Sequence, residues 1–174
     1  MKARRLLIAP VLLLVVALAC TDRTPTSVPA APAPDASLIG GLLGATGLLK
    51  CSNLPYASST ATIGAAGGSI SAGPHSLVIP PRALTAPTAI TMTAPTGLGV
   101  NAVKFQPEGL QFAVPAVLSM SYANCSLLGN LLPKRIAYTS DLLDILEYLL
   151  SVDNLLGKKV TGQVKHFSEY VIAW

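Results

Sequence analysis

The sequence predicts an all-β protein, an antiparallel β-sandwich, and three observations carry that prediction. From about residue 60 the chain consists of short runs of apolar and β-branched residues, with polar or small residues between them. Glycine and proline punctuate these runs about every ten residues, a spacing typical of sandwiches. Within the runs apolar residues recur with period 2, which predicts strands that bury one face. Ile90 and Met92 share one such face, and Leu118, Met120 and Tyr122 share another.

The runs are taken in chain order, each bounded by its own turn signals. The first three are separated by Gly64 with Gly67-Gly68, by Gly73-Pro74 and by Pro80-Pro81, residues that favour turns. The predicted strands are residues 60–63, 69–71, 76–79, 88–93, 117–122, 135–138 and 159–165.

Residues 141–150 allow two interpretations. The spacing of their leucines, with carboxylates at Asp141, Asp144 and Glu147, fits one short helix. A hairpin that turns near Asp141 to Asp144 is favoured, because the neighbouring segments are strands. The carboxylates lack the regular ligand spacing of a calcium loop, so they are interpreted as a solvated face or turn.

The N-terminal residues 1–19 have the pattern of a signal peptide. Lys2, Arg4 and Arg5 precede an apolar run that is too short to favour a spanning helix. The run ends in Ala17-Leu18-Ala19-Cys20, which resembles the lipobox of bacterial lipoproteins. That resemblance implies acylation of Cys20, a membrane-anchored envelope protein and, because Thr21 rather than Asp follows, sorting to the outer membrane. Ordinary secretion, with Cys20 lost or free, is the alternative.

Two further segments separate Cys20 from the predicted sandwich. Residues 20–37 alternate proline with small and polar residues, which predicts an extended tether with a reach of roughly 50 Å. Residues 38–59 form a lead-in, apolar and rich in glycine and leucine in its first part. We expect that part to pack on the domain as a flap tied down through Cys51, with a membrane-surface role as the alternative. The domain itself is assigned to residues 60–174.

Cysteine usage agrees with export. If Cys20 carries lipid, Cys51 and Cys125 remain as a pair in an oxidising compartment, which predicts a disulfide. The loop it closes, about 75 residues, corresponds to roughly 4 kcal/mol in the chain-entropy model. Two unpaired buried thiols are the alternative. Zinc is not predicted, because no Cys-x-x-Cys motif or histidine pair stands nearby.

Three stretches together resemble the ZU-five domain family. They are residues 67–70 with 77–84 (GGSI and LVIPPRAL), residues 106–112 with 115–118 (QPEGLQF and PAVL), and residues 166–170 (HFSEY). Arg82 stands where the family usually has glycine. The resemblance covers about residues 60–174 and implies a β-sandwich used for protein interaction, without a cofactor.

His166, Phe167 and Ser168 match a tripeptide at which some members of that family cleave their own chain. The resemblance implies attack of the Ser168 hydroxyl on the Phe167 carbonyl, giving an ester that water hydrolyses, with His166 moving the proton. In one regular strand His166 and Ser168 would face the core and Phe167 the solvent, so a bulge or bend is expected near 166–168. The favoured interpretation is structural: Phe167 fills the core, Ser168 bonds backbone at the bend, and His166 lies at the rim.

The charge of the chain and its motifs exclude several classes of function. Three of the twelve basic residues lie in the signal peptide. Without that segment the chain has nine basic and eight acidic residues, so its net charge is about +1. The remaining lysines and arginines are scattered along the chain, which excludes the basic patch of a nucleic-acid binder. No motif predicts an enzyme site, a metal site, a cofactor or a small-molecule substrate, and His75 is expected to be an exposed turn residue. We therefore expect a non-enzymatic envelope lipoprotein with an interaction or structural module that binds a protein partner; self-processing at Phe167-Ser168 is the alternative.

Overall fold

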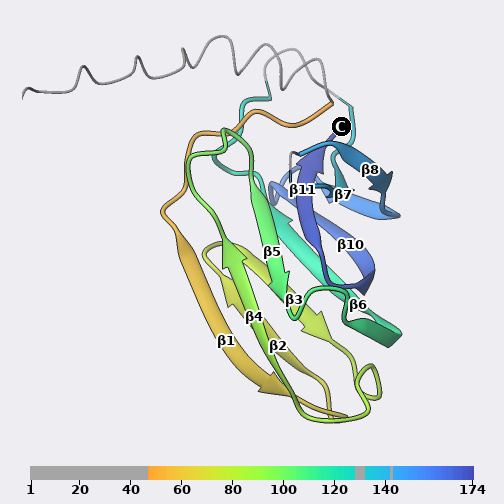
Figure 1. Ribbon diagram of the computed structural model, residues 1–174. Helices are drawn as coiled ribbons and strands as arrows, with labels where there is room; N and C mark the ends of the chain where they lie inside the picture. Colours follow the sequence, from red (N-terminus) through yellow and green to blue (C-terminus); the bar gives the residue numbers. More distant parts are fainter. Residues whose placement is uncertain (1–46, 128–131, 142) are drawn as a thin grey trace, which may run out of the picture. The chain divides into compact units, whose positions relative to one another are not determined.

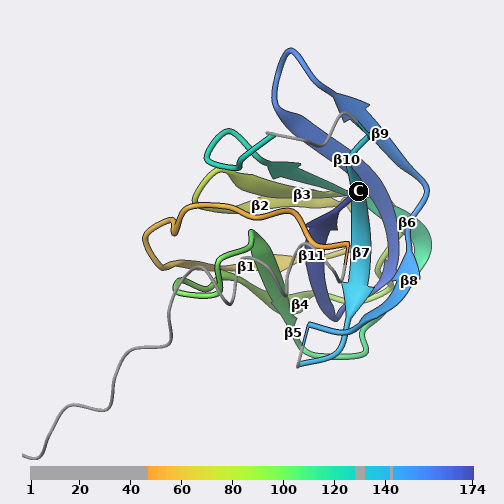
Figure 2. The same cartoon turned by 90° about the horizontal axis from the view of Figure 1, so that it is seen from above.

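The computed structural model describes residues 47–127, 132–141 and 143–174. The signal peptide, Cys20, the tether and the lead-in up to residue 46 lie outside the described residues. Within them the chain is all-β: two antiparallel sheets pack face to face, and no helix is present (Figures 1 and 2). The predicted β-sandwich is therefore confirmed.

The described residues form eleven strands. They are β1 (Ala57–Ile63), β2 (Gly68–Ala72), β3 (His75–Ile79), β4 (Thr88–Ala94), β5 (Ala102–Gln106), β6 (Gln111–Ser121), β7 (Arg135–Thr139), β8 (Ile145–Tyr148), β9 (Ser151–Asn154), β10 (Lys159–His166) and β11 (Glu169–Ala173). One sheet has the order β1-β4-β5-β11-β7-β8 and the other β2-β3-β6-β10-β9 (Figure 1). Each predicted strand matches an observed one, whereas β5 and β9 were not predicted.

The helix alternative for residues 141–150 is wrong. β7 and β8 pair antiparallel, with Ala137 opposite Tyr148. The turn between them lies at the expected place: the Leu143 N–H donates to the Ser140 carbonyl (2.9 Å) and the Ser140 N–H to the Asp144 carbonyl (3.1 Å). Pairing with β7 therefore overrides the helical spacing of the leucines, because cross-strand contacts decide sheet formation.

The core between the sheets is built from the alternating residues that the sequence identified. Ile90, Met92, Leu118, Met120 and Tyr122 have no exposed surface. Residues from both sheets form one contiguous cluster, which also includes the aromatic rings of the six-stranded sheet. Burial of this apolar surface is the main stabilising contribution to such a fold.

A second, smaller apolar cluster lies on the opposite face of the six-stranded sheet. Val171 and Ala173 belong to it, because they alternate along β11 with the core residues Tyr170 and Ile172. Leu48 covers this cluster and pairs with Ala173, while the Leu49 N–H donates to the Ile172 carbonyl (3.0 Å). The described end of the lead-in therefore packs on the domain, as the flap interpretation expects.

The turns on either side of β2 and β3 need left-handed backbone. Gly67 has φ +76°, and a Cβ there would come within 2.5 Å of the Ile79 carbonyl oxygen. Arg82 has φ +66° and donates its N–H to the Ala65 carbonyl (2.8 Å). The backbone at Arg82 thus adopts the conformation that glycine favours, at the position where the ZU-five pattern has glycine.

We predict that Gly67→Ala destabilises the domain by about 3 kcal/mol or more, since left-handed strain and overlap with the Ile79–Pro81 backbone add. Gly97→Ala is the matched control. Gly97 has φ +85° but open space around it, so strain alone costs about 1 kcal/mol. Urea denaturation of both variants measures the difference. Equal losses would show that the close approach at Gly67 contributes nothing.

Candidate functional site

The tripeptide His166-Phe167-Ser168 lies where the chain changes sheets. β10 ends at His166 in the five-stranded sheet, and β11 begins at Glu169 in the six-stranded sheet. The pairing of β10 with β6 also shifts register between Val164 and His166. The predicted bend is confirmed, and one regular strand through residues 160–174 does not form.

Phe167 fills the core at this bend. Its side chain is 1% exposed, stacks on Phe105 (4.7 Å between ring centroids) and meets Phe112 edge-on (5.0 Å). Its N–H donates to the Leu110 carbonyl (2.8 Å), and its carbonyl accepts from the Gly109 N–H (3.0 Å). The bend is thus held on both sides by backbone hydrogen bonds.

His166 lies half-buried at the rim, as expected. Its ring packs edge-on against Tyr138 (5.2 Å), and its Nδ1 lies 3.5 Å from the Phe167 carbonyl oxygen. The Tyr170 hydroxyl donates to the His166 carbonyl (2.6 Å). Burial raises the pKa of that hydroxyl, which keeps it a neutral donor.

Ser168 differs from the expectation. Among the described residues no hydrogen bond involves its hydroxyl, so the predicted bond to backbone is wrong; its carbonyl instead accepts from the Phe105 N–H (3.2 Å). Among the described residues, the non-glycine residues with left-handed backbone are Arg82, Leu143 and Lys158. The tripeptide itself therefore carries no backbone strain of that kind.

A polar row crosses the outer face of the six-stranded sheet beside this bend. Lys104, Glu169 and Thr139 are direct cross-strand neighbours on β5, β11 and β7. The Lys104 ammonium lies 2.8 Å from the Glu169 carboxylate and 3.6 Å from that of Asp141. Burial raises the pKa of Glu169, whereas the hydrogen bond to Glu169 raises the pKa of Lys104 and favours the charged lysine. The sequence carried no signal for this row, because pairing alone assembles it.

The row lines a hollow of about 350 Å³ that is open to solvent. Ser168 also lines this hollow. The Thr139 hydroxyl is buried and has no hydrogen-bond partner among the described residues. Lys104 pairs with Asp141 and Glu169, and Glu108 also lines the hollow, so one positive charge faces three carboxylates there.

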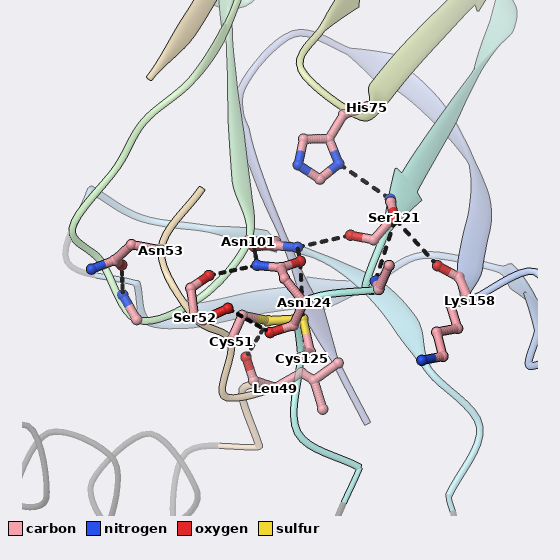
Figure 3. The surroundings of a disulfide bond; sticks show 12 residues. Leu49, Cys51, Ser52, Asn53, His75, Asn101, Ser121, Asn124, Cys125 and Lys158 are labelled. Carbon is pink, nitrogen blue, oxygen red and sulfur yellow. Dashed lines mark hydrogen bonds between the residues drawn. A yellow bond between two sulfur atoms is a disulfide. The ribbon is translucent and has the colours of Figure 1, made fainter. Parts of the chain in front are cut away.

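The Cys51–Cys125 disulfide is present, with an S–S distance of 1.98 Å, so the alternative of two unpaired thiols is wrong (Figure 3). It joins the lead-in to the segment that follows β6. Backbone hydrogen bonds flank it, from the Ser52 N–H to the Asn124 carbonyl (3.0 Å) and from the Ser126 N–H to the Lys50 carbonyl (2.9 Å). The lead-in is therefore fixed by bonds on both sides of the bridge.

His75 is buried, so its expected place as an exposed turn residue is wrong. Its side chain is 1% exposed, and its Nδ1 accepts from the Ser121 N–H (3.2 Å; Figure 3). Burial lowers the pKa of His75 to about 4, so the imidazole is neutral. The missed signal was periodicity: as the first residue of β3, His75 shares a face with the buried Leu77 and Ile79.

A pair of asparagines completes the polar cluster near the disulfide (Figure 3). The Asn101 amide donates to the Ser121 carbonyl (2.8 Å) and to the Asn124 side-chain oxygen (2.8 Å), and Asn124 donates back to the Asn101 side chain (3.0 Å). Since these groups pair with one another, the cluster is structural rather than reactive.

The two sides of the sandwich differ in their exposed edges. β8 and β9 are the edge strands of the two sheets on one side, and they follow each other in the chain. We name their exposed apolar side chains the β8–β9 edge: Leu146 (57% exposed), Tyr148, Leu150 (85%) and Val152 (73%). On the opposite side β1 and β2 expose hydroxyl residues: Ser58, Thr60, Thr62, Ser69 and Ser71.

Comparison of the chain with protein-family models and with curated proteins finds no match. In the described part of the chain, no group of three or more histidine, cysteine, aspartate or glutamate side chains could hold a metal ion. The same residues include no helix with the length and apolar character to cross a membrane.

We predict that His75 makes stability fall at acid pH. In the unfolded chain its imidazole takes up a proton below about pH 6.5, but in the folded chain only near pH 4. Stability is therefore complete above pH 6.5 and is lost as the pH falls toward 4, by about 2 to 3 kcal/mol at pH 4.5.

Urea denaturation at pH 7 and pH 4.5 checks this, with His75→Gln as the variant. The variant should lose less stability between the two pH values than the native chain does. His166→Gln, at the half-exposed histidine, is the control for loss of an imidazole. Equal pH dependence of the native chain and His75→Gln would contradict the assignment.

Proposed function

We propose that this protein is an exported bacterial envelope lipoprotein whose β-sandwich is a non-enzymatic module for binding another protein. The observation that carries the proposal is the β8–β9 edge. Leu146 on β8, Leu150 in the turn and Val152 on β9 are each more than half exposed. Exposed apolar side chains gathered around one turn and its two edge strands are typical of interaction sites.

The backbone of this edge supports the same function. β8 and β9 end the strand order of their sheets, so each has one side without a strand neighbour among the described residues. Soluble proteins commonly protect such edges with polar or charged side chains, as β1 and β2 do here with serine and threonine. An apolar edge suits a partner that adds an extended segment to the sheet, with backbone bonds for affinity and side chains for specificity.

The envelope location rests on the sequence. Residues 1–19 have the pattern of a signal peptide, Cys20 follows a lipobox-like segment, and residues 20–37 form a proline-rich tether. The Cys51–Cys125 disulfide is compatible with an oxidising compartment. The ZU-five resemblance, with Gly67 and Arg82 at its turns, also suggests an interaction domain.

Self-processing is the second candidate, and the geometry at the Phe167 carbonyl favours it. The Gly109 N–H donates to that oxygen (3.0 Å), a position from which it would stabilise negative charge developing during attack by Ser168. The His166 Nδ1 lies 3.5 Å from the same oxygen. Against it, Phe167 is fixed in the core, and the bend lacks left-handed strain.

We predict that a photo-crosslinking residue placed at Leu150 gives a discrete protein adduct in the intact envelope. The physical reason is the exposure of Leu150 between the two edge strands. Thr60, exposed on the opposite edge strand β1, is the matched control and should give none. Leu146→Asp with Val152→Asp should abolish the adduct by charging the surface. An adduct of equal yield at Thr60, or none at Leu150, would argue against binding at this edge.

We predict that the denatured protein from an exporting bacterium has the mass of one chain that begins at an acylated Cys20. Without reductant it should be two hydrogens lighter, owing to the disulfide. A chain ending at Phe167 with a separate peptide of residues 168–174, abolished by Ser168→Ala, would instead establish self-processing. An unmodified Cys20 would remove the lipid anchor from the proposal.

A further inference from the structure

The loop between β9 and β10 carries a second apolar surface, distinct from the β8–β9 edge. Leu155 is 60% exposed and Leu156 is 98% exposed, the most exposed large apolar side chain among the described residues. Figure 2 shows that the β9–β10 hairpin projects beyond the neighbouring strands. We name residues 155–159 the tip loop.

The charged residues of the tip loop are all basic. Lys158 and Lys159 follow the two leucines after Gly157 and are both exposed, and no acidic residue lies between Asn154 and Val160. The nearest carboxylate along the chain, Asp153, accepts hydrogen bonds from the Tyr122 hydroxyl (2.6 Å) and the Lys134 N–H (2.8 Å). Adjacent leucines and lysines therefore face solvent without a local counter-charge.

The tip loop lies at the end of the sandwich where the chain enters it. The Lys158 carbonyl accepts from the Tyr122 N–H (2.8 Å), the Tyr122 carbonyl from the Cys125 N–H (3.0 Å), and Cys125 is bonded to Cys51. Figure 3 shows Lys158 and the disulfide together at this end. Lys50, also exposed, adds a further positive charge beside the disulfide.

We infer that the tip loop docks on the surface of an anionic phospholipid bilayer. Exposed leucines enter the boundary between headgroups and acyl chains, while flanking lysines bind the anionic headgroups. The tether of residues 20–37 reaches roughly 50 Å and does not orient the domain by itself. Contact of the tip loop would orient it, with the entry end toward the membrane and the β8–β9 edge accessible to a partner.

This orientation rests on the proposed anchor at Cys20, whereas binding of the tip loop to lipid does not. The test therefore uses a chain of residues 21–174, exported behind a cleavable signal sequence, which keeps every described residue and has no acyl group. Its co-sedimentation is measured with vesicles of phosphatidylglycerol and phosphatidylethanolamine, and with vesicles of phosphatidylcholine alone, at low and high salt. The acylation state of Cys20 is settled independently by the mass measurement.

Three variants separate the contributions. Leu155→Gln with Leu156→Gln removes the apolar contact and should weaken vesicle binding by about tenfold or more. Lys158→Asn with Lys159→Gln should weaken binding to the anionic vesicles and reduce its salt dependence; asparagine suits the left-handed backbone at Lys158 (φ +48°). Leu150→Gln is the matched control, because Leu150 is similarly exposed but lies at the other end of β9, about 16 Å from Leu155.

The expected result is binding to the anionic vesicles that the first two variants weaken and Leu150→Gln leaves unchanged. The inference is overturned if the native chain does not sediment with anionic vesicles, or if Leu150→Gln weakens binding as much as the leucine pair does. It is also overturned if the leucine pair holds a dimer that sediments without lipid. The melting temperatures of all variants confirm that the substitutions at these exposed positions leave the fold intact.

Discussion

The chain passes from one sheet to the other within two residues, and the rest of the sandwich is arranged around that crossing. β10 lies between β6 and β9, and β11 lies between β5 and β7, so the bend joins two interior strands. Phe167 fills the space between the sheets, stacked on Phe105 and against Phe112, while backbone bonds to Leu110 and Gly109 hold its peptide groups. From Glu169 on every residue of β11 is buried, with Tyr170 and Ile172 in the core and Val171 and Ala173 in the cluster on the opposite face. At Phe167 the side chain is packed in the core and the backbone N–H and C=O groups are hydrogen-bonded. A bend inside a core is stable when both conditions are met.

The opposite end of the domain is closed by covalent and polar contacts rather than by aromatic packing. The Cys51–Cys125 bridge holds the lead-in, a loop closure that corresponds to about 4 kcal/mol in the chain-entropy model. Beside it the buried His75 and the Asn101–Asn124 pair satisfy one another and the backbone of Ser121. A buried polar cluster of this kind is stable only when its members are paired, because an unpartnered group would cost its full desolvation. The described end of the lead-in is accordingly part of the domain.

The proposed function rests on the contrast between the two sides of the sandwich. The β1 and β2 edges carry serine and threonine, whereas the β8–β9 edge carries leucine, valine and tyrosine. Exposed apolar side chains contribute little to the stability of the isolated domain, so the group on the β8–β9 edge suggests a contact outside it. The β8–β9 edge suits a protein segment, and the tip loop with its lysines suits an anionic membrane. The two surfaces occupy opposite ends of β9, so a single domain could contact both at once.

The sequence by itself determined the fold class, the position of most strands, the disulfide pair and the bend. Residues 88–93 and 117–122 alternate strictly, which is a local property of a strand with one buried face. The bend was predictable because a regular strand would have exposed Phe167. Tertiary structure decided the burial of His75, the strands β5 and β9, and the row of Lys104, Glu169 and Thr139. The physical reason is that alternation reports which side of a strand is apolar, whereas strand order and cross-strand neighbours depend on contacts between residues far apart in the chain.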